Sequence, residues 1–254
     1  MLWKDAPVTT PAPGAGQSRL MLLDSASMYF RAFFGVPEIT NDEGTPVNAV
    51  RGFMDFISRL VDQYDPDRLV CCWDKDWRPA WRVELIPTYK THRVVAEVAT
   101  GPDVEEVPDP LEVQVPIILE VLDAFGIAVR GADGYEADDV IGTLATGDGG
   151  PVDVVTGDRD LFQLVDDEAA VRVLYIARGV GNHERVDDAW VRGKYAVSAR
   201  QYADFATLRG DASDGLPGVA GVGEKTAATL LSRFDDMDGI LAADRKSTRL
   251  NSSH

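Results

Sequence analysis

Short apolar segments rich in β-branched residues alternate along this chain with amphipathic helical segments, and this alternation restricts the fold. The apolar segments lie at 19–24, 67–74, 126–131, 152–158 and 171–176, and the helical patterns between them at 47–64, 111–126 and 137–146. Strands that alternate with helices form βαβ units, in which a parallel sheet is covered by helices on both faces. From about residue 187 to 243 the pattern is helical. We therefore expect an α/β domain followed by a smaller helical module.

Carboxylates follow several of the predicted strands directly. Asp24 ends RLMLLD, Asp74 ends LVCCWD, and the DRD sequence after VDVVTG contains Asp158 and Asp160. Because ligands of an open parallel sheet bind outside the carboxyl ends of its strands, these acids should share one edge. Five further acids come from a predicted helix start and from a turn-rich loop: Glu136, Asp138, Asp139, Asp211 and Asp214.

Two interpretations of GYEADD at 134–139 compete. Acids in the first turn of a helix complement its dipole, which stabilises the helix by about 0.3–1 kcal/mol per charge. Nine converging acids, however, repel one another by roughly 4 kcal/mol per pair at about 4 Å, and Arg159, between Asp158 and Asp160, is the only basic residue flanked by two of them. Oxygen ligands select Mg²⁺ or Mn²⁺, and two such ions can clamp a phosphodiester during in-line displacement. We therefore favour metal ligands over caps.

Composition leaves the class of substrate open. The net charge of −17 opposes nucleic-acid binding, which usually depends on Lys and Arg contacts to phosphate, but a site for several divalent cations must itself be acidic. No run of about 18 apolar residues is present, so no membrane span is expected. Residues 1–18 are rich in Pro, Gly and Ala and are predicted to be a disordered leader. A cytoplasmic protein is expected.

Six sequence blocks occur in a characteristic order: LLDSASMYFRAFF at 22–34, CWD at 72–74, WRVELIPTYKTHR at 81–93, GYEADD at 134–139, TGDRDLFQL at 156–164 and LRGDASDGLPGVAGVGEKTAATLL at 208–231. Together they resemble the 5′-nuclease family, which comprises the 5′→3′ exonuclease domain of bacterial DNA polymerase I, stand-alone bacterial 5′→3′ exonucleases and flap endonucleases. The resemblance implies a PIN-like parallel sheet at 19–186 and a helix-three-turn-helix DNA-binding module at 187–243.

The resemblance also implies roles for individual residues. Asp24, Asp74, Glu136, Asp138 and Asp139 look like a first-metal group, and Asp158, Asp160, Asp211 and Asp214 like a second. The segment at about 82–110 resembles the base of a helical arch, in which Lys90 stabilises the scissile phosphate while Arg93 and Arg82 bind adjacent phosphates. If this region is helical, Lys90 and Arg93 share a face. Unlike many relatives, residues 94–110 are acidic and contain no Lys or Arg.

The sequence GLPGVAGVGEK at 215–225 resembles the hairpin that grips duplex DNA in this family. Amides near Gly218, Gly221 and Gly223 can approach phosphate closely because no Cβ intrudes. Lys225 is a further expected phosphate contact, and carbonyls of the turn are expected to hold K⁺. A simple helical hairpin with a glycine turn is the alternative interpretation.

The C-terminal residues 244–254 break the helical pattern without a cap. We interpret them as a non-native, adapter-derived tail that truncates the helical module. The expected function is Mg²⁺-dependent 5′→3′ exonuclease and flap endonuclease activity of a monomer on DNA with 5′ ends, flaps or nicks, with an RNA primer as a further substrate. The alternatives are an inactive DNA-binding scaffold, a PIN-like RNA nuclease and a phosphatase for small substrates.

Overall fold

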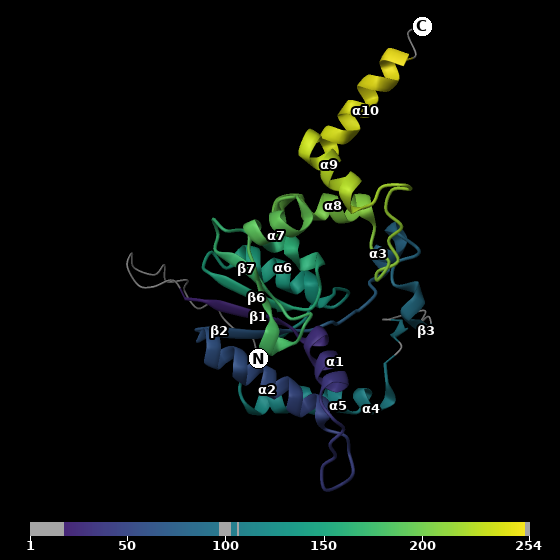
Figure 1. The fold of residues 1–254 in the computed structure, drawn as a ribbon. Helices are drawn as coiled ribbons and strands as arrows, with labels where there is room; N and C mark the ends of the chain where they lie inside the picture. Colours follow the sequence, from purple (N-terminus) through teal and green to yellow (C-terminus); the bar gives the residue numbers. More distant parts are fainter. Residues whose placement is uncertain (1–17, 97–102, 106, 252–254) are drawn as a thin grey trace, which may run out of the picture.

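A six-stranded sheet forms the centre of the molecule (Figure 1). The computed structural model describes residues 18–96, 103–105 and 107–251. The strand order β5-β2-β1-β6-β7-β8 is made by β1 (Leu20–Asp24), β2 (Arg68–Cys72), β5 (Ala128–Arg130), β6 (Val152–Thr156), β7 (Val171–Tyr175) and β8 (Glu184–Val186). All neighbours are parallel except β7 and β8. The predicted parallel sheet is confirmed. The strand β8 was not predicted, because it is short and polar.

Side chains of the central strand alternate between two apolar clusters, one on each face of the sheet. On β1, Leu20 and Leu22 pack with α6 (Ala137–Gly147), while Met21 and Leu23 pack with α2 (Asn48–Tyr64). Figure 1 shows α1 (Ser25–Gly35), α2 and α5 (Gln114–Ala124) on one side of the sheet and α6 and α7 (Asp188–Tyr195) on the other. Burial on both faces explains why the strand sequences are continuously apolar.

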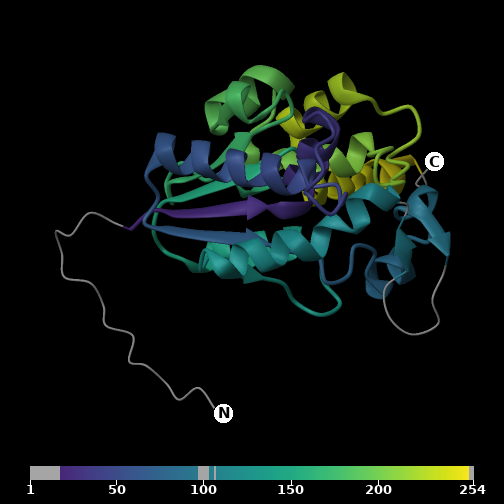
Figure 2. The ribbon, with the colours of Figure 1, turned by 90° about the horizontal axis from the view of Figure 1, so that it is seen from below.

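The carboxyl ends of β1 and β2 point toward the side of the molecule that carries α3 (Ala80–Leu85) and β3 (Val94–Ala96), as their arrowheads show in Figure 2. At the end of β1, the Asp24 side chain accepts a hydrogen bond from the Ser27 amide and caps α1. The strand therefore passes directly into a helix at its acidic residue.

The predicted arch segment is not a continuous helix. After α3 the chain forms a turn, the short 3-10 helix η1 (Thr91–Arg93), and an antiparallel pair of β3 with β4 (Val104–Glu105). Lys90 has a left-handed backbone with φ 48° and precedes η1. The expectation that Lys90 and Arg93 share a helical face is therefore wrong, because Pro87 and the left-handed Lys90 interrupt any helix there.

The C-terminal part of the chain is helical, as predicted. Its helices are η4 (Ala199–Gln201), α8 (Tyr202–Arg209), α9 (Glu224–Phe234) and α10 (Met237–Asn251), and Figure 1 shows α10 extending away from the sheet. The expected break after Ala243 is absent, since α10 continues to Asn251; the non-native origin of this tail stays a prediction. The shorter elements elsewhere are α4 (Asp109–Glu112), η2 (Asp160–Leu164) and η3 (Val180–Asn182).

Two further expectations concern the N-terminal leader and membrane-spanning helices. Of the predicted leader, all but Ser18 lies outside the described residues. Within the described part of the chain, no helix has both the length and the apolar character needed to cross a bilayer.

One strand carries a charge inside the sheet. Asp153 on β6 is fully buried, and its carboxylate accepts from Arg172 Nε at 2.6 Å and from Arg19 Nη1 at 3.0 Å. Arg172 is the direct cross-strand partner of Asp153 on β7. The ion pairs thus offset the cost of burying this carboxylate and fix the register between the two strands.

We expect Asp153→Ala to lower the free energy of unfolding by about 2–3 kcal/mol, because two guanidinium groups lose their partner while remaining only partly exposed. Urea denaturation measures this change. Asp55→Ala is the control: Asp55 forms an exposed pair with Arg59 one helical turn away, so its loss should cost less than about 0.5 kcal/mol. Equal effects of the two substitutions would contradict this account of the buried charge.

Candidate active site

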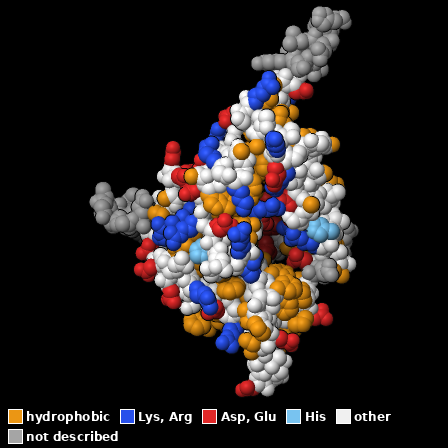
Figure 3. Space-filling model, viewed as in Figure 1, with side chains coloured by type: hydrophobic (Ala, Val, Ile, Leu, Met, Phe, Trp, Pro, Cys, Tyr) orange, Lys and Arg blue, Asp and Glu red, His pale blue; other side chains and the backbone are white. Residues whose placement is uncertain are grey.

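A cavity of about 490 Å³ lies at the carboxyl ends of the central strands. Figure 3 shows acidic side chains at the bottom of a hollow on this face, with Lys and Arg side chains around it. Two predicted basic residues, Lys90 and Arg93, line the cavity together with five of the nine predicted acids: Asp24, Asp74, Glu136, Asp138 and Asp158. The convergence expected from the strand ends is thus present for these residues.

Neighbouring elements hold the innermost carboxylates in place. Asp24 is 6% exposed and accepts a 2.6 Å hydrogen bond from Thr156 Oγ1 at the end of β6. Asp74, just beyond β2, accepts a 2.8 Å hydrogen bond from the amide of Ala137 at the start of α6. Ser27 Oγ accepts from the amide of Gly157. These bonds tie α1, α6 and three strand ends into one rigid floor.

The floor of the cavity is electrostatically crowded. Burial, opposed by the Thr156 hydrogen bond and reinforced by Asp74, raises the pKa of Asp24 to about 7. Burial and then the charges of Asp24 and Asp158 raise the pKa of Asp138 well above its ordinary value. The pKa of Asp74 is also raised, chiefly by burial. Folding therefore brings together carboxylates that are harder to ionise here than they would be if each were isolated in water.

The remaining predicted second-metal acids lie next to this floor. Asp160 has one carboxylate oxygen buried without a hydrogen-bond partner among the described residues, and burial followed by the charges of Asp158 and Asp211 raises its pKa to about 7. Burial likewise raises the pKa of Asp214. For Asp211, hydrogen bonds from Ser213 outweigh burial, so that its pKa is lowered.

Glu136 and Asp139 act as helix caps as well. They form a capping box at the start of α6, in which each side chain accepts from the other residue's backbone amide. Arg82 bridges them, with Nη1 2.8 Å from Glu136 Oε1 and Nη2 2.9 Å from Asp139 Oδ1. The capping interpretation that we set aside therefore holds for these two acids, and their role as metal ligands stays a prediction.

Fixed cations compensate more of the acids than the sequence indicated. Only Arg159 was expected, yet Arg82, Lys90, Arg93 and Arg209 also form ion pairs with predicted ligands. Arg82, Lys90 and Arg93 were missed because they come from segments distant from their partners, whereas Arg209 stands only two residues before Asp211. Arg82, predicted to bind phosphate, has its guanidinium committed to Glu136 and Asp139.

Lys90 and Arg93 are held at the cavity by long-range contacts. Lys90 Nζ lies 2.5 Å from Glu136 Oε2, and Tyr89 Oη donates to the other oxygen of Glu136. Burial alone would lower the pKa of Lys90, but Glu136 and Asp214 raise it, so the ammonium stays charged. Arg93 Nη2 donates to the Ser213 carbonyl and to Asp214. A loop far along the chain thus positions both cations.

The acids suit divalent cations, although they do not form a closed cage. In the part of the chain that the structure describes, no group of three or more His, Cys, Asp or Glu side chains comes together tightly enough to hold a metal ion. Mg²⁺ typically keeps several waters and binds proteins through one or two carboxylates together with substrate phosphates. The all-oxygen donor set, the raised pKa of Asp24 and the unpartnered oxygen of Asp160 fit such an open site.

The predicted DNA-binding glycines fall into two kinds. Gly218, with φ 64°, packs against Gly210, and a Cβ on it would lie 2.4 Å from the Gly210 amide nitrogen. Nothing lies within 4 Å of a Cβ built on Gly221 or Gly223. Gly223 precedes α9 without a side-chain cap, and Lys225 is exposed in its first turn. Gly221 and Gly223 can therefore admit a phosphate, whereas Gly218 serves the packing of the turn.

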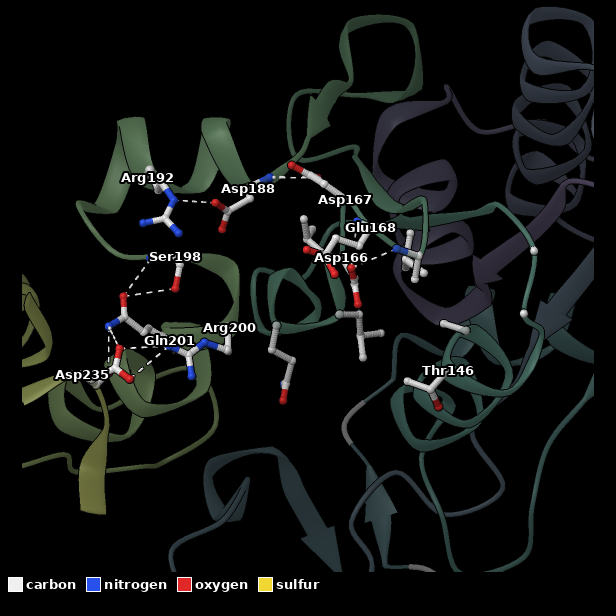
Figure 4. A pocket seen from close by; sticks show the side chains of 18 residues that line it. Thr146, Asp166, Asp167, Glu168, Asp188, Arg192, Ser198, Arg200, Gln201 and Asp235 are labelled. Atoms are coloured by element: carbon white, nitrogen blue, oxygen red, sulfur yellow. Dashed lines mark hydrogen bonds and ion pairs between the residues drawn. The ribbon is translucent and has the colours of Figure 1, made fainter. Parts of the chain in front are cut away.

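A separate groove of about 820 Å³ shares no residue with the acidic cavity. Its polar side chains pair with one another: Figure 4 shows Arg192 bound to Asp188, and Arg200 and Gln201 bound to Asp235. The first pair lies within α7, and the contacts of Arg200 and Gln201 connect η4 to the end of α9. We assign this groove to packing of the helical part rather than to chemistry.

Comparison with known proteins agrees with this geometry. Residues 19–196 match the model of the 5′-3′ exonuclease N-terminal resolvase-like domain, and residues 197–253 match that of the 5′-3′ exonuclease C-terminal SAM fold. A 5′-3′ exonuclease of Streptomyces coelicolor is 64% identical over 224 residues, which cover 88% of this chain and 74% of the relative. The chain belongs to the 5′-3′ exonuclease family.

More distant relatives show where this exonuclease fits. A 5′-3′ exonuclease of Bacillus subtilis is 36% identical over 88% of this chain and 73% of its own length. DNA polymerase I of the same organism is also 36% identical, over 89% of this chain but only 24% of the polymerase.

Solved structures share the fold at low sequence identity. The T5 D15 protein co-crystallised with metal ions superimposes with a TM-score of 0.68 at 19% identity, covering 88% of this exonuclease and 78% of the T5 chain. The catalytic core of Rad2 in complex with a DNA substrate gives 0.55 at 16% identity, with 94% and 69% of the two chains covered. The fold class predicted from the sequence is thereby confirmed.

Several residues of the site were missed in the sequence. Tyr89 precedes Lys90 and Thr156 ends β6, so their positions beside predicted residues could have signalled them. Glu105 lines the cavity but lies in the acidic segment whose sequence fits neither a helix nor a strand period. No local pattern identifies it.

We expect Asp160→Asn to raise the melting temperature of the metal-free exonuclease at alkaline pH. Above its pKa of about 7 the wild-type carboxylate is ionised in a crowded site, and because this pKa exceeds that of the unfolded chain, stability falls as the pH rises through it. Scanning calorimetry in EDTA tests the sign. Added Mg²⁺ should raise the melting temperature of wild type more than that of the variant; a lower melting temperature of the variant in EDTA would contradict the crowding.

Proposed function

We propose that this exonuclease hydrolyses DNA phosphodiesters from 5′ ends with two or more Mg²⁺ ions, for which Mn²⁺ substitutes. It leaves a 5′-phosphate and a 3′-hydroxyl, and it also acts as a structure-selective flap endonuclease. The observation that carries the proposal is the cavity itself, where buried carboxylates with raised pKa values face two fixed cations. No other charge arrangement among the described residues combines these features.

Each group of residues has a task in this proposal. Asp24, Asp74, Asp138 and Asp158 provide oxygen ligands from the floor, with Asp160, Asp211 and Asp214 beside them. Divalent ions bound there supply Lewis-acid chemistry that lowers the pKa of an attacking water and stabilises the leaving oxygen. Lys90, held by Glu136, presents its ammonium to the scissile phosphate, and Arg93 to the neighbouring one.

The helical module provides the grip on duplex DNA. Amides at Gly221 and Gly223, the uncapped start of α9 and Lys225 form a phosphate-binding end without base contacts. Carbonyls of the turn at 218–223 are proposed to hold K⁺. Structures of the T5 D15 flap endonuclease with DNA and metal ions and of Rad2 with a DNA substrate share this fold, which supports DNA with 5′ ends, flaps or nicks as the substrate. We propose that a monomer acts on these ends, including RNA primers, at the nucleoid.

The test uses a 5′-labelled flap duplex with Mg²⁺ or EDTA and compares wild type with Asp158→Asn. We expect short labelled fragments only with Mg²⁺, and a fall in kcat of about 10²-fold or more in the variant, because an electrostatic element of the transition state is lost. Asp55→Asn, an equal charge change on the exposed face of α2, is the control and should cut normally. Folded wild-type protein that binds the flap but cuts nothing with Mg²⁺ or Mn²⁺ would refute the proposal in favour of a scaffold.

A further inference from the structure

The return strand of the arch segment places an additional carboxylate in the catalytic cavity. Glu105 on β4 pairs with Val94 on β3, and it lines the same cavity as Lys90 and Arg93. Burial raises the pKa of Glu105, and Arg93 is the opposing influence that lowers it most. The side chain is therefore partly buried, and it is close enough to Arg93 and Lys90 for their charges to lower its pKa.

A set of contacts two residues earlier fixes this position. The carboxylate of Asp103 pairs with Arg78, and the Asp103 carbonyl accepts a 2.7 Å hydrogen bond from Trp77 Nε1. Arg78 is only 5% exposed, and its Nε also donates to the Tyr89 carbonyl at 2.8 Å. The buried guanidinium of Arg78 thus contacts both Asp103, two residues before Glu105, and Tyr89, the residue before Lys90. Glu105 and Lys90 keep a fixed relation to each other.

Glu105 lies in a field of both signs. Burial is the main cost of ionising its carboxylate, Arg93 and Lys90 attract the charge, and Asp74 and Glu136 repel it. Its charge offsets the field of Arg93 and Lys90 at the point where phosphates would approach. A long 5′ single strand places several phosphates near Glu105, and each of them is repelled by its carboxylate. A recessed 5′ end places only the phosphates of the scissile bond there.

We infer that Glu105 is a specificity-determining residue that disfavours long 5′ single strands relative to nicked or recessed 5′ ends. This inference rests on the proposed function, because it assumes that the 5′ strand passes the arch segment. The inference assigns roles to two acids of the segment. Asp103 holds β4 in place through Arg78, and Glu105 discriminates between substrates.

The test compares Glu105→Gln with wild type on two substrates that share one duplex, a nick and a long 5′ flap. In Mg²⁺ we expect the KM for the flap to fall about 3- to 10-fold, since one repulsive charge is removed at partly screened distance. The KM for the nick should change by less than about 2-fold, since few phosphates pass Glu105. Flap binding should also depend more steeply on salt. The slope of log binding constant against log salt concentration should change by up to about 0.7 for each additional phosphate that the variant contacts.

Matched variants separate charge from folding. Glu112→Gln makes the same charge change at an exposed position on α4 and should leave the flap-to-nick ratio unchanged. Glu105→Ala, a second neutral variant, should reproduce the effect of Glu105→Gln, and Glu105→Asp should retain most of the discrimination. Melting temperatures establish that each variant is folded in the assay.

Two results would overturn the inference. One is a flap-to-nick ratio that stays at the wild-type value in both folded neutral variants. The other is a loss of cleavage on both substrates that is restored by higher Mg²⁺, which would make Glu105 a metal ligand instead. Wild type that cleaves neither substrate would refute the proposed function itself, so the two failures are distinguishable.

Discussion

Mutual repulsion among carboxylates at the carboxyl ends of a parallel sheet is the constraint around which this exonuclease is built. A parallel sheet brings the ends of β1, β2 and β6 together, and here an Asp stands at the end of β1 and two residues beyond β2 and β6. The fold answers the repulsion with hydrogen bonds that orient the acids, such as Thr156 to Asp24 and the Ala137 amide to Asp74. These bonds fix the acids but do not neutralise them.

Compensation divides the acids into a paired and an unpaired set. Glu136, Asp139, Asp211 and Asp214 each have a Lys or Arg partner. Among the described residues, no ion pair reaches the unpaired set of Asp24, Asp74, Asp138, Asp158 and Asp160, and for four of these burial raises the pKa. The paired set therefore positions cations at the cavity, and under our proposal the unpaired set binds divalent ions.

This division decides how much the sequence could predict. The strand-end acids were predictable because apolar runs ending in Asp at 24, 74 and 158 mark the same sheet edge once the sheet is parallel. The partners of the paired acids were not: Arg82 lies on α3, Lys90 and Arg93 follow in an irregular segment, and all three reach acids that are distant in the sequence. Lys90 adopts its left-handed backbone where its amide binds the Asp214 carbonyl. Contacts between segments so far apart depend on tertiary packing, which local patterns do not encode.

Similar limits apply to the helical part and the sheet edge. The glycine turn at 215–223 was predictable as a turn, but close packing against Gly210 assigns Gly218 a role that composition could not distinguish from phosphate binding. The short polar strand β8 forms only because β7 offers it an edge. In both cases a neighbouring segment selects the local conformation.

The number of divalent ions that bind the protein tests the proposed metal site most directly. Titration of the metal-free exonuclease with Mn²⁺, followed by the electron paramagnetic resonance signal of free Mn²⁺, measures the number of ions bound and their affinity. We expect more than one site that Mg²⁺ can compete for, with binding weakened by Asp24→Asn and separately by Asp160→Asn. Binding unaffected by either substitution, or no binding by folded wild-type protein with a flap substrate present, would contradict the proposal that the unpaired carboxylates hold metal.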